Sequence, residues 1–208
     1  MNFHLRRGMS VILMSVRKGA PYKDRVEDDG RVLIYEGHDI PAERGGSDPK
    51  SVDQQLRNPR GGLTQNGLFW EAATAVARAS ASPEFVRVYE KLRSGIWVYN
   101  GVFRLISAWE ERSDGRRVFK YRLEIDPDAS PEDADLPGRD VDQTRLIPTP
   151  VKLEVWKRDR GRCVECGGTT NLHFDHIIPY SRGGSSLVSE NIQLLCARHN
   201  LVKRDRIV

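Results

Sequence analysis

The chain has 208 residues, of which 38% are hydrophobic and 30% are charged, and its formal net charge is +4. This composition predicts a soluble globular protein, and the length leaves room for one large domain or two modest ones, of which we expect two. The longest apolar run, residues 9–16, is far too short to cross a bilayer, so we expect no membrane partner. Three cysteines cannot form a closed set of disulfides, and we therefore expect a cytoplasmic protein.

Charge divides the chain into three parts. Residues 1–125 carry 21 Lys and Arg against 16 Asp and Glu, residues 126–148 carry 2 against 7, and residues 149–208 carry 10 against 6. We expect two basic domains, 1–125 and 149–208, joined by an acidic, proline-rich linker that cannot bury much apolar surface. Two basic domains suggest one polyanion bound by both, although ordinary solubility explains the same charge.

The first domain is predicted to be mostly β-structure. Residues rich in β-branched and aromatic side chains predict strands at 31–37, 85–92, 95–111 and 117–125. One helix is predicted at residues 66–80, with Asn66 as its N-cap and alanines along its body. This pattern indicates an α+β fold built on a twisted sheet or an open β-barrel.

Four segments of the first domain carry a family resemblance. They are PYKD at residues 21–24, IYEGHD at 34–39, the region from the glutamine pair to Asn66 at 54–66, and VRVYEKLRSGIWVYNGVFRLISAW at 86–109. Over residues 10–125 the sequence resembles the SRA domain, also called the YDG domain, which recognises a modified cytosine flipped out of duplex DNA. The family's Tyr-Asp-Gly stands here as Tyr99-Asn100-Gly101, and because Asn adopts the same turn conformation we expect the fold to be kept.

A pocket for a flipped base must supply aromatic faces that replace lost stacking, and polar groups that read the edge of the base. Tyr22 and Tyr35 match the family's two stacking aromatics, and the alternative for each is ordinary packing in the sheet. We expect Asp24 to accept a hydrogen bond from the N4 amine of cytosine, which thymine lacks. The base implied by the resemblance is 5-methylcytosine or 5-hydroxymethylcytosine.

A long segment containing glycine and arginine, residues 40–65, interrupts the strands. Flipping a base leaves a hole in the duplex that a protein side chain must fill. We expect Arg44, Lys50, Arg57 and Arg60 to be available for DNA phosphates or for the orphaned guanine. The alternative is a solvated surface loop.

Two short-spaced pairs of metal ligands stand in the second domain. Cys163-x-x-Cys166 is followed, after 29 residues, by Cys196-x-x-His199. Two such pairs supply the four ligands of a closed, structural Zn²⁺ site, which would replace the core that so short a domain cannot build. The alternatives are unrelated thiols with a surface histidine, or an iron–sulfur cluster, which the Cys₃His ligand set disfavours.

Further motifs lie among these ligands. Residues 172–179 alternate like a strand, residues 180–186 predict a turn, and residues 189–205 have the apolar spacing of a helix. With Asp175-His176, Asn191 and Asn200 in this pattern, residues 151–205 resemble the HNH endonuclease family. The resemblance implies a ββα-metal domain stapled by zinc.

The HNH resemblance assigns a role to each of these residues. His176 matches the general base, and the usual pKa of histidine lets it accept a proton at physiological pH. Asp175 and Asn200 match the ligands of a catalytic divalent cation, Mg²⁺ or Mn²⁺. Asn191 matches the asparagine that holds the loop orienting the histidine. His173 lies two residues before Asp175 on the same strand face, and we expect it to support the site rather than to bind metal.

Together the two resemblances predict a modification-dependent DNA endonuclease that flips a modified cytosine and hydrolyses the backbone nearby. Its expected partner is double-stranded DNA carrying modified cytosine. Because one such site cuts one strand, we expect a homodimer or two chains that meet on DNA. The alternatives are a non-catalytic reader whose zinc module only clamps DNA, and a nuclease that acts on unmodified DNA.

Overall fold

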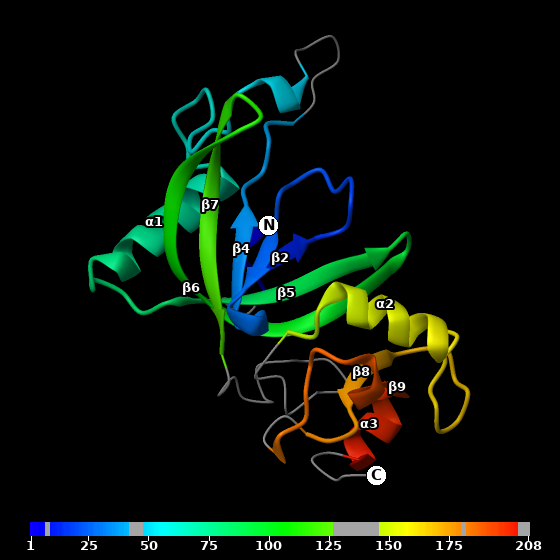
Figure 1. The fold of residues 1–208 in the computed structure, drawn as a ribbon. Helices are drawn as coiled ribbons and strands as arrows, with labels where there is room; N and C mark the ends of the chain where they lie inside the picture. Colours follow the sequence, from blue (N-terminus) through cyan, green and yellow to red (C-terminus); the bar gives the residue numbers. More distant parts are fainter. Residues whose placement is uncertain (7–8, 42–47, 127–145, 180–181, 204–208) are drawn as a thin grey trace. The chain divides into compact units, whose positions relative to one another are not determined.

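The protein is represented by a computed structural model that describes residues 1–6, 9–41, 48–126, 146–179 and 182–203 (Figure 1). The chain divides into two compact units. The first contains Met1–Lys91 and Tyr99–Ile125, and the second contains Leu92–Val98 and Asp126–Val208. Most of the predicted acidic linker, residues 127–145, lies outside the described residues. Within the described ranges, none of the helices has the length and apolar character needed to span a membrane.

A seven-stranded sheet with the order β1-β2-β5-β6-β7-β4-β3 forms the framework of the first unit (Figure 1). Its strands are β1 (Asn2–Arg6), β2 (Met9–Met14), β3 (Arg25–Glu27), β4 (Val32–Glu36), β5 (Glu84–Arg93), β6 (Ile96–Ser113) and β7 (Arg116–Ile125). The sheet ends at two free strands, β1 and β3, so it is open. This confirms the α+β fold class with an open sheet.

Sequence patterns located four of the seven strands. The four predicted strands correspond to β4, β5, β6 and β7. β1, β2 and β3 were not predicted: β3 has only three residues, too few to establish an alternating pattern, and β2 coincides with the apolar run at residues 9–16. β2 pairs in parallel with β5, and β4 pairs antiparallel with β7, so segments far apart in the sequence lie side by side in the sheet.

Helix α1 (Gln65–Ala77) packs its aromatic residues against the sheet. Phe69 is buried and meets the ring of Tyr121 edge-on, with 6.0 Å between the ring centroids. The prediction that Asn66 caps this helix is wrong. The N-cap is Thr64, whose hydroxyl accepts a hydrogen bond from the Gly67 amide at 3.1 Å. Asn66 lies inside the first turn, where its side chain holds another segment of the chain.

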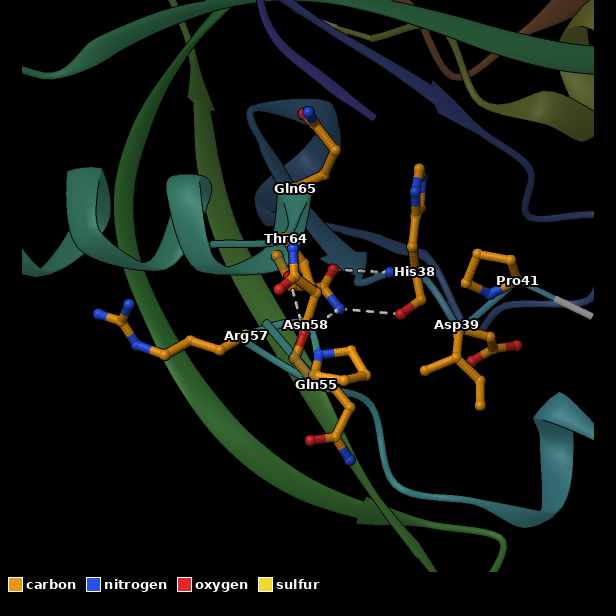
Figure 2. Close-up of a pocket in the computed structure, with 11 residues that line it drawn as sticks. His38, Asp39, Pro41, Gln55, Arg57, Asn58, Thr64 and Gln65 are labelled. Atoms are coloured by element: carbon orange, nitrogen blue, oxygen red, sulfur yellow. Dashed lines mark hydrogen bonds between the residues drawn. The ribbon is translucent and has the colours of Figure 1, made fainter. Parts of the chain in front are cut away.

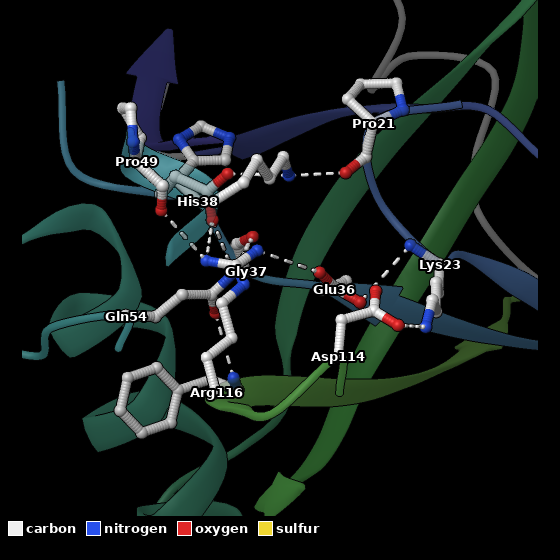
Figure 3. A network of polar contacts seen from close by, with 12 residues as sticks. Pro21, Lys23, Glu36, Gly37, His38, Pro49, Gln54, Asp114 and Arg116 are labelled. Carbon is white, nitrogen blue, oxygen red and sulfur yellow. Dashed lines mark hydrogen bonds and ion pairs between the residues drawn. The ribbon is translucent and has the colours of Figure 1, made fainter. Parts of the chain in front are cut away.

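A network of buried charges connects the end of β4 to β7 (Figure 3). The Lys120 ammonium, which is fully buried, lies 2.7 Å from the Glu36 carboxylate. Arg116 donates to Asp39 at 2.6 Å, just beyond the end of β4. The Gln54 side chain accepts from the Phe119 amide at 2.9 Å and donates to the Gly37 carbonyl at 2.7 Å. The chain after β4, Gly37–Asp39, is therefore fixed by polar contacts on several sides.

The second unit contains a small ββα arrangement preceded by a helix (Figure 1). Its elements are α2 (Thr149–Arg158), the antiparallel strands β8 (Leu172–His176) and β9 (Ile192–Cys196), and α3 (Ala197–Lys203). Its hydrophobic core consists of Leu92, Ile147, Val151, Val155, Phe174, Ile192 and Leu194. α2 was not predicted, although Pro150 at its first turn is a common start signal.

The predicted helix over residues 189–205 is wrong in its first half. Residues 189–191 form a short 3₁₀ turn, residues 192–196 form β9, and the α-helix begins at Ala197. Ile192 and Leu194 are both fully buried, as alternate residues on one face of a strand would be. The apolar run is short, and such a run fits a buried strand as well as a helix.

Replacement of Lys120 by methionine should destabilise the first unit by about 3–5 kcal/mol, because it leaves the Glu36 carboxylate buried without its closest cation. Urea denaturation followed by circular dichroism measures the loss. The control is Arg117→Met, because the Arg117 guanidinium is 45% exposed and lies 3.8 Å from Asp53. That exposed pair should be worth less than about 1 kcal/mol. Equal losses in the two variants would contradict a structural role for the buried network.

Candidate functional site

Four metal-ligating side chains converge in the second unit. The ligand atoms of Cys163, Cys166, Cys196 and His199 all lie within 4.8 Å of one another. The Cys166 and Cys196 sulfurs are 3.9 Å apart, and the His199 Nδ1 atom lies 3.4 Å from the Cys163 sulfur and 3.3 Å from that of Cys196. Zn–S bonds of about 2.3 Å and Zn–N bonds of about 2.0 Å would place tetrahedral ligands about 3.5–3.8 Å apart. The cluster therefore fits Zn²⁺.

The first cysteine pair lies on a tight turn. The Cys163 amide donates to the Gly168 carbonyl and the Gly167 amide donates back to the Cys163 carbonyl, both at 2.8 Å. Gly167 has a φ of +72°, which favours glycine at this turn. Burial alone would raise the pKa of the Cys163 thiol, but hydrogen bonds from backbone amides and from His199 lower this pKa to about 6. A lowered pKa favours the thiolate, which is the form that binds metal.

His176, the predicted general base, ends strand β8 and is almost fully buried. Its Nε2 atom lies 2.8 Å from the Ser186 hydroxyl. Burial, followed by the charge of Lys203, lowers the pKa of His176 to about 4. The imidazole is therefore neutral at pH 7, and the same shift makes it a weaker base than a free imidazole.

Asp175 forms an ion pair with Lys203, which is also buried. The Lys203 ammonium lies 2.8 Å from Asp175 Oδ2 and donates to the His176 carbonyl at 2.6 Å. The Gln193 amide also donates to Asp175 Oδ2, at 3.3 Å. Asn200 is buried and lies three residues before Lys203 on α3, which places both on one face of the helix. Asp175 is thus paired with the Lys203 ammonium, and Asn200 is a buried amide on the helix that carries this lysine. Carboxylate and amide oxygens suit a hard divalent ion.

Asn191 fixes the loop that follows His176. Its side chain accepts from the Ile178 amide at 2.9 Å and donates to the carbonyls of Ile178 and Ser185 at 3.0 and 3.1 Å. Gly184 passes so close that a Cβ atom there would lie 1.7 Å from the Ile178 carbonyl oxygen. Asn191 therefore joins Ile178 and Ser185, on either side of this loop, to each other.

Three residues of this cluster were not found from the sequence: Ser186, Gln193 and Lys203. Each reaches Asp175 or His176 from a position ten or more residues away, through a single side-chain contact. No periodicity indicates such a contact. His173 is half-buried, burial lowers its pKa, and its predicted supporting role stays a prediction.

In the first unit, the predicted base-reading residues lie around His38. The Tyr22 ring is roughly parallel to the His38 ring, with 6.2 Å between their centroids. The Tyr35 hydroxyl lies 3.3 Å from His38 Nε2, and the Tyr35 side chain is only 1% exposed. Lys50 places its ammonium 3.9 Å from the centroid of the Tyr22 ring and 2.6 Å from Asp39. The two tyrosines are therefore brought together, with part of their surface covered by Lys50 and His38.

Asp24 is partly buried and is bound by two backbone amides. Its Oδ1 accepts from the Glu36 amide at 2.9 Å and its Oδ2 accepts from the Ser15 amide at 3.0 Å. Burial raises the pKa of Asp24 to about 6, although the two amide hydrogen bonds oppose this shift. Each carboxylate oxygen keeps a second lone pair that could accept from a ligand.

Next to His38 lies a cavity of about 680 Å³ (Figure 2). Its wall is formed by His38, Asp39, Ile40, Pro41, Gln55, Arg57, Asn58, Pro59, Thr64, Gln65 and Asn66. The Asn66 side chain accepts from the His38 amide and donates to the His38 carbonyl, both at 2.8 Å. This explains why Asn66 is not the helix cap, because its amide joins the start of α1 to the cavity wall.

The predicted DNA-contacting arginines are placed in part. Arg57 lines the cavity, donates to the Gly61 carbonyl at 2.8 Å and lies 3.5 Å from Glu71. Arg60 is exposed on a turn whose backbone is held by the Asn58 side chain. Arg44 lies outside the described residues.

Removal of zinc should unfold the ββα arrangement, because the four ligands join α3, β9 and the turn after α2. We expect about one zinc ion per chain by atomic emission spectroscopy. Cys166→Ser should abolish this zinc and reduce the helical signal in circular dichroism. His173→Gln, a change at a histidine of the same unit outside the ligand set, should leave the zinc content unchanged. Full zinc occupancy in Cys166→Ser would refute the assignment of the site.

Comparisons with solved structures find likenesses that cover just over half of the chain. The SUVH5 SRA domain in its complex with methylated CHH DNA is 26% identical, with 56% of this chain and 63% of that chain covered and a TM-score of 0.39. The SUVH5 SRA domain bound to fully hydroxymethylated CG DNA is 29% identical, with 56% and 64% covered and a TM-score of 0.38. The DNA modification-dependent restriction endonuclease AspBHI is 16% identical, with 55% and 54% covered and a TM-score of 0.35.

This chain spans less than two thirds of the length of those solved chains. No curated protein matches it. The family model described as HNH endonuclease matches residues 163–206, the segment that contains the Cys₃His cluster together with His176 and its neighbours. The chain therefore carries an HNH endonuclease domain at residues 163–206.

Proposed function

We propose that this protein is a modification-dependent DNA endonuclease. The observation that carries the proposal is the buried pair Asp175-His176, held beside the Cys₃His cluster within a segment that matches HNH endonucleases. Residues 1–125 would read the modified base, residues 149–208 would cut, and residues 126–148 would join the two. Residues 92–98, which belong to the second unit, would then be a part of the reading domain that packs with the nuclease core.

The nuclease residues would divide the work of phosphodiester hydrolysis. Neutral His176 accepts the proton of the attacking water. Asp175 and Asn200 hold Mg²⁺ or Mn²⁺, which when bound stabilises negative charge on the phosphate and on the leaving 3′ oxygen. Asn191 keeps the loop after His176 in place. The products are 5′-phosphate and 3′-hydroxyl ends.

The reading residues would take up a flipped cytosine that carries a methyl or hydroxymethyl group at C5. Tyr22 and Tyr35 supply the aromatic faces. Asp24 accepts from the N4 amine through a free lone pair. Support comes from the position of both tyrosines beside His38, which also forms part of the cavity wall, and from the contact of Asp24 with the amide of Glu36, the residue after Tyr35. Arg57 and Arg60, at and beside that cavity, would contact the DNA backbone or the orphaned guanine.

The proposal predicts selective cleavage, which can be measured with two duplexes of identical sequence, one 5-methylated at cytosine and one unmodified, in Mg²⁺ or Mn²⁺. We expect the wild type to cut only the methylated duplex. His176→Ala should lower the cleavage rate by about 10²–10⁴-fold and leave binding to the methylated duplex unchanged. Tyr22→Ala should weaken binding to the methylated duplex, with a loss of about 1–3 kcal/mol.

Other outcomes of this experiment separate the alternatives. Binding of the methylated duplex without any cleavage by the wild type would leave a non-catalytic reader. Equal cleavage of both duplexes would show that the first domain does not read modified cytosine. His4→Gln serves as the control for His176→Ala, because it changes a histidine of the first unit whose side chain is 52% exposed, and this variant should cut at a rate close to that of the wild type.

A double-strand break should require two chains, because one site of this kind cuts one strand. We expect a homodimer, or two chains that meet on DNA. Light scattering of the protein with a methylated duplex should give a mass that corresponds to two chains per duplex. A complex containing one chain that breaks both strands in a single encounter would disprove this arrangement.

A further inference from the structure

The contact between His176 and Ser186 lies in the interior of the nuclease domain. The Ser186 hydroxyl is 2.8 Å from His176 Nε2. Ser186 is 0% exposed and His176 is 2% exposed, so the contact between them is shielded from solvent. The Nε2 side of the imidazole is thus occupied by a protein group, and the other nitrogen of the ring is Nδ1.

A neutral imidazole carries one N–H group and one lone pair. If Nδ1 carries the hydrogen, the lone pair lies on Nε2 and faces the buried serine. If Nε2 carries the hydrogen, that hydrogen is donated to Ser186 Oγ and the lone pair lies on Nδ1. Only the second tautomer has its basic atom away from the buried contact.

We propose that Ser186 is a positioning residue that holds His176 as the Nε2–H tautomer and makes Nδ1 the proton acceptor. This inference rests on the proposed role of His176 as the general base. During hydrolysis Nδ1 takes a proton from the attacking water, and the resulting imidazolium keeps its Nε2 hydrogen bond to Ser186. The water oxygen bonds to phosphorus, the bond from phosphorus to the 3′ oxygen breaks, and the 3′ oxygen takes a proton from solvent.

The loop that carries Ser186 is fixed on both sides. Asn191 donates to the carbonyl of Ser185, the residue before Ser186, at 3.1 Å. The amide of Leu187, the residue after it, donates to the Ser185 hydroxyl at 3.0 Å. The hydroxyl of Ser186 is therefore held at a defined place beside the ring. Asn191 would act on His176 through this loop: it holds Ser185, and the next residue, Ser186, contacts the imidazole.

The test combines a spectroscopic readout with kinetics on the full chain. Nuclear magnetic resonance with ¹⁵N-labelled histidine reports which imidazole nitrogen carries hydrogen, and the signals of His176 are assigned by their loss in His176→Gln. We expect a protonated Nε2 and an unprotonated Nδ1 in the wild type at neutral pH. Ser186→Ala should give a mixture of tautomers, and Ser186→Thr, which keeps the hydroxyl, should restore the wild-type signals.

The rate of cleavage of the methylated duplex should fall in the variant that loses the Nε2–H tautomer and recover in the variant that regains it. We expect Ser186→Ala to lower kcat by about 10²-fold with KM unchanged, and Ser186→Thr to recover most of this loss. Ser189→Ala is the matched control, because it removes a buried hydroxyl of the same unit that lies 3.5 Å from Glu190, and it should keep both the tautomer and most of the activity. Zinc content shows that each variant is folded.

Two results would overturn the inference: an Nδ1–H tautomer in the wild type, or wild-type kcat in Ser186→Ala. A wild type that cleaves no duplex would refute the proposed function instead. The spectra of the wild type and of Ser186→Ala would still decide whether Ser186 sets the tautomer, so the two failures are distinguishable.

Discussion

Convergence of four Cys and His side chains on one point is the constraint on which the nuclease domain depends. The two strands β8 and β9 have five residues each and α3 has seven, too little to build a stable core from their own apolar surface. The cluster ties the end of β9 and the first turn of α3 to the turn after α2. Because α3 is fixed at His199, Lys203 on the same helix is brought to Asp175. The Cys₃His cluster thus helps to set the position of the groups around Asp175.

In the first unit, buried ion pairs instead of a metal site hold the segment that carries His38. Glu36 and Asp39, at and just after the end of β4, are paired with Lys120 and Arg116 of β7, and these side chains have little or no exposure. Burying such charges is costly unless every group is paired, so the segment between them has few alternative conformations. His38 lies within that segment. The residue shared by the tyrosine cluster and the cavity is therefore held in place by a network of buried charges.

Features that depend on neighbouring residues could be predicted from the sequence, and contacts between distant residues could not. The spacing of the two zinc-ligand pairs and the long strands were recognisable because their evidence lies within a few neighbouring residues. The helix predicted over residues 189–196 failed because a short apolar run satisfies both strand and helix periods, and only pairing with β8 decides between them. Asn66 was mistaken for the cap because its partner, His38, is 28 residues away. Ser186 and Lys203 were missed for the same reason, since each acts through one contact across the fold.

In the proposed mode of reading, the base must replace contacts that the tyrosines already make. The ion pair between Lys50, which is 40% exposed, and Asp39 is worth about 0–1 kcal/mol, and the cation–π contact with Tyr22 adds about 0.5–1 kcal/mol. The hydrogen bond between Tyr35 and His38 contributes about 0.5–1.5 kcal/mol. Stacking returns about 1–3 kcal/mol per base, so the exchange is close to balanced. Stacking therefore leaves little energy to distinguish one base from another, and discrimination has to come from the polar edge of the base and from the fit around C5, where Asp24 has free lone pairs.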